Sequence, residues 1–256
     1  MSAVHLRIEE NGAAHLHLDN PSKLNAFTPS MLTALEDHCA TLDADPTVRG
    51  VIITAKGDRA FCAGADIAAW AGLSPADFAR HWVRTGHRIF DRLARLSKPT
   101  IAVVHAHAFG GGLELAAACD IRVMGSGATL ALPEPQIGIV PGWSGTQRLC
   151  RLLPESVVKE MVLFGRRLDA ARAQQLGFAA KVSETPLDIA MDWVGHLSTM
   201  SAYAIEVAKY QIHAAVGEDR AAMIETLGSG MIGASADKIE GVAAFAEKRP
   251  PRFSNL

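Results

Sequence analysis

Three consecutive glycines at residues 110–112 precede a short apolar segment that holds a single carboxylate, Glu114. The segment is rich in leucine and alanine, which favour a helix. Glycine allows close backbone approach, and the first turn of a helix presents N–H groups that can bind an anion or a developing oxyanion. A plain tight turn between a strand and a helix is the alternative. The pattern matches neither G-x-G-x-x-G nor G-x-x-x-x-G-K-[ST], so it does not favour a nucleotide-phosphate site.

Two glutamates could divide acid and base chemistry between them. Glu114 stands in the first turn of the expected helix, and Glu134 lies between two prolines that restrict the backbone around it. Carboxyl groups brought together in an apolar site can have different pKa values, so that one donates a proton while the other accepts one. The alternatives are a helix-dipole partner for Glu114 and a solvated loop residue for Glu134. The spacing alone does not show that the two side chains converge.

Three further groups invite a chemical interpretation. Residues 61–67 carry small side chains after an expected strand, so a ligand could reach their N–H groups, although a plain loop is the alternative. His105 and His107 would share one face of a strand, but no third ligand stands at a metal-binding spacing, so no metal site is predicted. Ser144 lies outside any G-x-S-x-G motif and has no partner recognisable from a motif, which argues against a serine hydrolase.

The composition is that of an ordinary globular protein, and it excludes several classes. The 256 residues suffice for one substantial core, and 49% hydrophobic with 20% charged residues argues against general disorder. The net charge of −2 argues against a nucleic-acid or polybasic membrane binder. No apolar run approaches the roughly 18 residues of a membrane span. Four widely spaced cysteines and an N-terminus without a signal-peptide pattern predict reduced thiols in the cytoplasm.

Strand and helix signals alternate over the first half of the chain. Residues 4–9 and 15–19 alternate apolar with polar side chains, and the Asn-Gly pair between them predicts a hairpin. Helices are expected after Thr28 and Ser74, each of which is followed by proline. Buried strands are predicted at residues 51–54, 101–104 and 121–124. This alternation predicts a layered α/β fold.

Helix signals predominate beyond about residue 155. Asp169 and Ser235 are expected helix caps, and Pro186 is expected in a first turn. No linker-like composition separates the two parts. We therefore expect an α/β core over residues 1–195 and a C-terminal helical region over 196–256 within the same structural unit.

Taken together, the motifs resemble those of the enoyl-CoA hydratase/isomerase (crotonase) family over nearly the whole chain. Any one of them is weak, but the ordered set is specific. The matching segments are residues 24–26, 61–67, 98–99, 108–116, 119–120, 133–134, 138–142, 145–149 and 247–249.

The resemblance implies a core of repeated ββα units with a C-terminal helical region that forms trimers, usually paired into a hexamer. It implies an acyl-CoA thioester substrate, so coenzyme A arrives as part of the substrate and no metal or redox cofactor is needed. The implied enzyme is an enoyl-CoA hydratase, a hydro-lyase of fatty-acid metabolism such as β-oxidation, which adds water across the 2,3 double bond.

The resemblance also implies roles for individual residues. The backbone N–H groups of Ala65 and Gly111 would form an oxyanion hole, and the Gly142 N–H would help to hold the reacting water. Glu114 would be the base and Glu134 the acid. The implied coenzyme A contacts are Lys23, Leu24, Ala63, Asp66, Ile67, Ala68 and Lys248.

Two segments depart from the usual family pattern. His105-Ala106 replaces Asn-Gly, and Trp143-Ser144 stands within the usual P-G-x-G-G. The second departure adjoins the implied water site, where Trp143 is expected to narrow or roof the pocket.

Several alternatives remain beside hydration. A Δ3-Δ2-enoyl-CoA isomerase needs only a proton shuttle, but the presence of both glutamates favours a hydratase. Other reactions of CoA thioesters remain as further alternatives. Some relatives bind RNA through a lysine-rich helix, whereas residues 31–43 contain neither lysine nor arginine. An inactive scaffold is disfavoured because both glutamates and both oxyanion positions are present.

Overall fold

In the computed structural model, which describes residues 2–218 and 220–254, the predicted N-terminal hairpin is present. Strand β1 (Ala3–Ile8) pairs antiparallel with β2 (Ala13–Asp19). Gly12 in the turn adopts φ +84°, a left-handed conformation that glycine takes without a steric penalty. The Asn-Gly signal is therefore confirmed as a turn.

The hairpin forms one edge of a six-stranded sheet in the order β1-β2-β3-β5-β7-β10. The three predicted apolar runs are its buried central strands, which lie parallel to one another: β3 (Gly50–Ala55), β5 (Thr100–Val104) and β7 (Ile121–Gly125). The short strand β10 (Lys181–Ser183) completes the far edge.

A four-stranded sheet in the order β4-β6-β8-β9 continues from the first. Its strands are β4 (Ala60–Cys62), β6 (His107–Phe109), β8 (Thr129–Ala131) and β9 (Leu168–Asp169). Each of the successive pairs β3/β4, β5/β6 and β7/β8 places its first strand in the larger sheet and its second in the smaller one. The predicted repeat of two strands and a helix is thus confirmed, and it brings the loops after β4, β6 and β8 to one edge.

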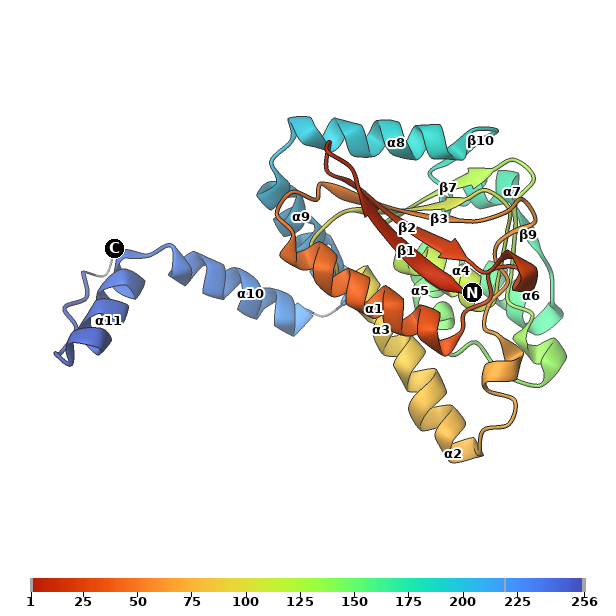
Figure 1. The fold of residues 1–256 in the computed structure, drawn as a ribbon, viewed down its shortest axis with the longest axis horizontal. Coiled ribbons are helices and arrows are strands. Elements are labelled where there is room, and N and C mark those ends of the chain that lie inside the picture. The colour runs from red at the N-terminus through yellow and green to blue at the C-terminus, as the bar shows by residue number, and fades with distance from the viewer. Residues whose placement is uncertain (1, 219, 255–256) are drawn as a thin grey trace. The chain divides into compact units, whose positions relative to one another are not determined.

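Helices cover both faces of the larger sheet (Figure 1). On one face, α8 (Pro186–His196) packs Ala190 and Val194 against Ile52, Ile101 and Val103. On the other face lie α1 (Pro29–Ala44), α3 (Arg84–Ala94) and α4 (Gly111–Ala118). The Thr28 hydroxyl caps α1 by accepting the Met31 N–H at 3.3 Å, as the sequence predicts.

The helix expected after Ser74 is interrupted. It consists of α2 (Pro75–Asp77), a π-helical stretch η3 (Phe78–Val83) and then α3. The remaining helices of this part are η1 (Pro21–Lys23), η2 (Ile67–Ala69), η4 (Glu134–Ile137), α5 (Gly145–Leu152), α6 (Glu155–Phe164), α7 (Ala170–Gln175) and η5 (Leu197–Thr199). The Asp169 carboxylate caps α7 by accepting the Arg172 N–H at 2.8 Å, as expected.

The chain divides into two compact units, Met1–Ala202 and Tyr203–Leu256. The second contains most of α9 (Ala202–Ala215), with α10 (Arg220–Gly233) and α11 (Ala236–Glu247). Ser235 caps α11 by accepting the Lys238 N–H at 3.1 Å, which confirms the expected cap. In the described ranges, every helix is too short or too polar to span a membrane.

Candidate active site

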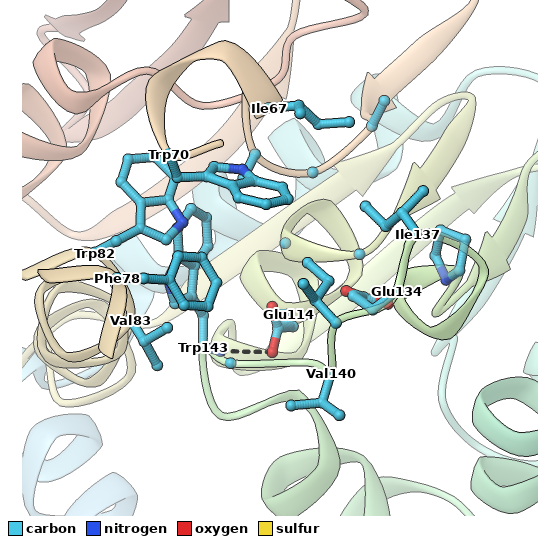
Figure 2. A pocket seen from close by; sticks show the side chains of 18 of the residues that line it. Ile67, Trp70, Phe78, Trp82, Val83, Glu114, Glu134, Ile137, Val140 and Trp143 are labelled. Atoms are coloured by element: carbon cyan, nitrogen blue, oxygen red, sulfur yellow. Dashed lines mark hydrogen bonds between the residues drawn. The ribbon is translucent and has the colours of Figure 1, made fainter. Parts of the chain in front are cut away.

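A cavity of about 250 Å³ lies in the first unit, at the edge where the strands of the smaller sheet end (Figure 2). The two glutamates and the three backbone positions singled out from the sequence all line it: Ala65, Gly111, Glu114, Glu134 and Gly142. These residues come from four separate segments of the chain. The fold therefore brings together the groups that the resemblance assigned to one site.

Each glycine before α4 has its own steric reason. Gly110 adopts φ +51°, a backbone conformation that glycine takes freely and that would be strained in a residue with a side chain. A Cβ on Gly111 would lie 2.8 Å from the Trp143 ring, and one on Gly112 would lie 2.1 Å from the Cys62 carbonyl oxygen. The three glycines thus let α4 begin directly against β4 and Trp143, with its first N–H groups at the cavity.

The Ala65 and Gly111 N–H groups lie on the two segments that approach each other at Gly64 and Gly111. Gly64 precedes Ala65 with φ +112°, and its Cβ position would lie 3.4 Å from the Gly111 nitrogen. Among the described residues, neither N–H donates a hydrogen bond to another protein group. Two donors directed at one cavity can share a single oxygen acceptor.

Glu114 is held in place by the loop that precedes α5. The Trp143 and Gly145 N–H groups both donate to its Oε1, each at 2.8 Å. Only 3% of Glu114 is exposed, and this burial raises the pKa of the carboxyl, whereas the two N–H donors and the nearby Arg148 oppose the rise. Glu114 is therefore buried but supplied with groups that stabilise its charged form.

Glu134 is also buried, but it lacks a comparable set of N–H donors from a neighbouring loop. It begins η4 between two prolines, is 8% exposed, and its Oε2 has no hydrogen-bond partner among the described residues. Burial, with a smaller contribution from the charge of Glu114, raises the pKa of Glu134 to about 7. The two carboxyl groups therefore differ in what supports their charged forms: Glu114 accepts two N–H donors, whereas Oε2 of Glu134 has no partner among the described residues.

The implied coenzyme A contacts fall into three groups. Ala63 and Ile67 line the cavity, and Ala63 also lines an adjoining cavity of about 450 Å³ together with Leu24. The Lys23 ammonium lies 2.7 Å from Asp66, whose carboxylate also accepts the N–H of Ala68 at 3.3 Å. Lys248 belongs to the second unit, where it is exposed and follows α11.

An aromatic wall borders the two carboxyl groups, and sequence analysis found only part of it. Trp70, Phe78, Trp82 and Trp143 gather on one side of the glutamates, and Ile137 lies on the other (Figure 2). Phe78 and Trp82 both belong to the π-helical stretch η3 and line the cavity, and Trp82 is also part of the hydrophobic core. Trp143 lines the cavity, and its ring centroid lies 5.3 Å from that of Trp82. The aromatic clustering in residues 70–82 was the signal available in the sequence.

His105 and His107 have different hydrogen-bond partners. His105 bonds to the Gly57 carbonyl oxygen at 2.9 Å, whereas His107 bonds to the Thr129 hydroxyl at 2.9 Å and stacks on Phe109. In residues 2–218 and 220–254 no cluster of three metal-ligating side chains occurs.

Ser144 does have a hydrogen-bond partner, although no sequence motif indicated one. Its Oγ lies 2.9 Å from His87 Nδ1, and His87 Nε2 lies 3.4 Å from Asp91. Ser144 is buried and is not among the residues that line the cavity. Ser144, His87 and Asp91 match a hydrolase triad in their residue types only, because the serine hydroxyl lies against α3 and not in the cavity.

Comparisons with known proteins agree with this geometry. A model of the enoyl-CoA hydratase/isomerase family matches residues 8–255. The crotonyl-CoA hydratase of Syntrophomonas wolfei is 34% identical, over 96% of this chain and 95% of that protein. The mitochondrial enoyl-CoA hydratase of Pongo abelii is 36% identical, over 97% of this chain and 86% of that protein. A solved enoyl-CoA hydratase from Bacillus anthracis has a TM-score of 0.81 at 29% identity, over 99% of each chain.

The fold and the cavity define an enzyme whose buried carboxyl groups face backbone N–H donors. The chain belongs to the enoyl-CoA hydratase/isomerase family, as the motifs predicted.

Proposed function

We propose that this enzyme is an enoyl-CoA hydratase, which adds water across the 2,3 double bond of a 2-enoyl-CoA thioester. The observation that carries the proposal is the contrast between the two carboxyl groups in one cavity. Glu114 accepts two N–H donors, whereas Glu134 Oε2 has no partner among the described residues. This contrast provides a base and an acid side by side, which is what hydration requires.

The thioester oxygen would lie between the N–H groups of Ala65 and Gly111. When water attacks C3, negative charge moves through C2 onto this oxygen, forming an enolate. Donors already directed at that position stabilise the charge without reorganising, and removal of one such donor typically costs about 10²–10³ in rate. Gly111 can supply its N–H because it is the first residue of α4, where the helix offers no acceptor.

The proton balance closes with the two glutamates. The ionised Glu114 takes one proton from water as the oxygen bonds to C3, and the Gly142 N–H helps to orient that water. Glu134 gives its proton to C2, and the enolate collapses to the 3-hydroxyacyl thioester. After the product leaves, Glu114 releases its proton to solvent and Glu134 takes one up, which restores the starting state. The reaction exchanges only protons and water, so we propose no metal or redox cofactor.

Two alternatives are less well supported. An isomerase moves one proton between C2 and C4 and needs a single carboxylate, so it leaves the second glutamate without a role. A serine hydrolase needs its hydroxyl in the cavity, and Ser144 lies against His87 behind the loop.

The coenzyme A part of the substrate would lie along Leu24, Ala63 and the segment 66–68. Lys23 and Lys248 would contact its phosphates. The ion pair with Asp66 holds the Lys23 ammonium beside this segment.

We further propose a homo-oligomer, a trimer or a dimer of trimers, assembled through the C-terminal helices in the cytoplasm. Light scattering on the purified protein tests the assembly, and fractionation of the source cells tests the location. A monomer, or recovery in a membrane or organelle fraction, would refute the respective proposal.

The function is tested by following the absorbance of the conjugated enoyl thioester with crotonyl-CoA and longer homologues. We expect rapid loss of absorbance with appearance of a 3-hydroxyacyl-CoA. Isomerisation of a 3-enoyl-CoA without hydration of any 2-enoyl-CoA would overturn the proposal in favour of the isomerase.

A further inference from the structure

The loop between η4 and α5 determines where the Glu114 carboxylate lies. Its two N–H donors to Oε1 come from Trp143 and Gly145, the residues on either side of Ser144. Both donors can point at one oxygen only if the backbone turns sharply between them. The orientation of Glu114 therefore depends on the backbone conformation of residue 144.

Ser144 adopts that conformation at a steric cost. Its φ is +74° with ψ +10°, a left-handed conformation that side chains other than those of glycine, asparagine and aspartate rarely take. The family pattern usually has glycine here. A serine at this position needs a compensating contact to hold the same turn.

The compensating contact is the hydrogen bond from Ser144 to α3. Oγ lies 2.9 Å from His87 Nδ1, while His87 Nε2 lies 3.4 Å from the Asp91 carboxylate. The tautomer that carries its proton on Nε2 suits both contacts, because Nε2 then donates to Asp91 and Nδ1 accepts the serine hydroxyl proton. Ser144 is 6% exposed, whereas the His87 side chain is 38% exposed, so the bond is shielded from water on the serine side.

The chain of contacts returns to the loop through α5. The Asp91 carboxylate also binds the guanidinium of Arg148, which is 5% exposed, and the Arg148 N–H donates to the Ser144 carbonyl oxygen at 3.0 Å. Ser144, His87, Asp91 and Arg148 thus form a closed ring that joins α3 and α5 behind the catalytic loop. None of these four residues lines the cavity that holds the two glutamates.

We infer that Ser144 and His87 are positioning residues for Glu114: their hydrogen bond holds the left-handed turn that directs the Trp143 and Gly145 N–H groups at the carboxylate. The inference rests on the proposed hydratase function for its kinetic readout, but not for its structural one. It predicts that the loss of the hydroxyl acts through the backbone and not through contact with substrate.

A pair of substitutions at one position separates the two effects. Ser144→Ala keeps the strained φ and loses the bond, so kcat for hydration should fall about tenfold, with KM changed less than about twofold. Ser144→Gly loses the same bond but takes the turn freely, so kcat should stay within about threefold of wild type. Equal losses in both variants, or full activity in Ser144→Ala, would overturn the inference.

Substitutions of His87 test the other end of the bond. His87→Ala should match Ser144→Ala, and His87→Asn, which keeps a polar atom near the position of Nδ1, should recover part of the loss. The Ser144→Ala/His87→Ala double variant should be no slower than either single variant, because both remove one contact. Arg88→Ala is the matched control, because Arg88 is the next residue on α3 but pairs with Glu36 and leaves the ring intact. A multiplicative loss in the double variant would contradict a shared role.

The pH profile distinguishes positioning from general loosening. The charged groups that face Glu114 are Glu134 on η4 and Arg148 on α5, and the two loop N–H donors lower the pKa of the Glu114 carboxyl against the effect of burial. Weaker donors in Ser144→Ala should raise that pKa, so the acidic limb of kcat/KM should move to higher pH, and in Ser144→Gly it should stay.

Hydrogen exchange tests the positioning role of Ser144 independently of the proposed hydratase activity. Amide exchange measured by mass spectrometry on peptides covering residues 142–146 should become faster in Ser144→Ala and not in Ser144→Gly. If wild type hydrates no enoyl-CoA, the proposed function fails while this measurement still decides the inference. If wild type is an active hydratase and exchange is unchanged in Ser144→Ala, the inference fails alone.

Discussion

The indole ring of Trp143 packs directly against Gly111, so closely that a Cβ at position 111 would lie 2.8 Å from ring atom Cζ3. The same ring is fixed by edge-on contacts with Phe27 and Phe90, with centroid separations of 6.2 and 5.2 Å. The proposed oxyanion donor and the loop that holds Glu114 therefore share one rigid contact. A substitution at Gly111 should therefore displace Trp143, and a substitution at Trp143 should alter the position of Gly111.

Gly111→Ala should lower kcat about tenfold or more, because the new methyl displaces either the Gly111 N–H or the Trp143 ring by overpacking. Adding Trp143→Ala should restore part of the activity by making room for the methyl. The measurement is a double-mutant cycle on kcat, with thermal unfolding of each variant as the control. Additive effects of the two substitutions would show that the contact has no functional consequence.

Glu114→Gln and Glu134→Gln should each lower hydration of crotonyl-CoA by at least about 10²-fold, because glutamine keeps the shape but cannot exchange a proton. The double variant should lose much less than the product of the two losses, since the groups act as one unit. Binding of coenzyme A, followed by calorimetry, should change little and serves as the control. Full hydratase activity in either variant would remove that glutamate from the mechanism.

The rate of hydration should fall on the alkaline side of neutrality. Glu134 must be protonated to act as the acid, and burial places its pKa at about 7. Above that pH the acid is ionised, so kcat/KM should drop about tenfold per pH unit. A profile that is flat from about pH 6 to pH 9 would show that the acid is a different group.

The pKa of Glu134 also predicts how stability depends on pH. The folded state holds this proton up to about pH 7, whereas the unfolded chain releases it near the ordinary value of 4.5. The native state therefore binds more protons than the unfolded state between these values, and the free energy of unfolding falls as pH rises through this window, by roughly 3 kcal/mol at most. Denaturant unfolding of wild type at both ends of the window, with Glu134→Gln as the matched control, measures the effect. Glu134→Gln should show a weaker dependence, and an equal slope in both proteins would assign the dependence to other groups.

No binding of RNA tighter than about micromolar is expected at physiological salt, because affinity for nucleic acid rests on unneutralised basic groups. The first helix, α1, carries no lysine or arginine, and two of its three acidic residues, Glu36 and Asp43, pair with Arg88 and Arg92 of α3. A gel-shift titration at two salt concentrations checks this expectation. A salt-sensitive shift at nanomolar protein would refute it.

Much of the fold could be predicted from local signals. The Asn-Gly hairpin, the Thr28 and Asp169 caps and the three buried strands all depend on residues adjacent in sequence, and each was confirmed. The course of the chain after Ser74 was predicted less well. A π-helical stretch shifts the helix face there, and apolar spacing alone cannot reveal such a shift because it assumes one regular period.

By itself, the sequence determined the family, the α/β class and the identity of the groups available for chemistry, because these depend on residue types in a fixed order. The contrast between Glu114 and Glu134 was decided only by tertiary structure. It arises from burial and from N–H donors contributed by a loop 29 and 31 residues away along the chain. The Ser144–His87 bond, which spans 57 residues, was likewise hidden. Burial and hydrogen bonding set a carboxyl group's pKa through neighbours in space, and residue spacing does not specify those neighbours.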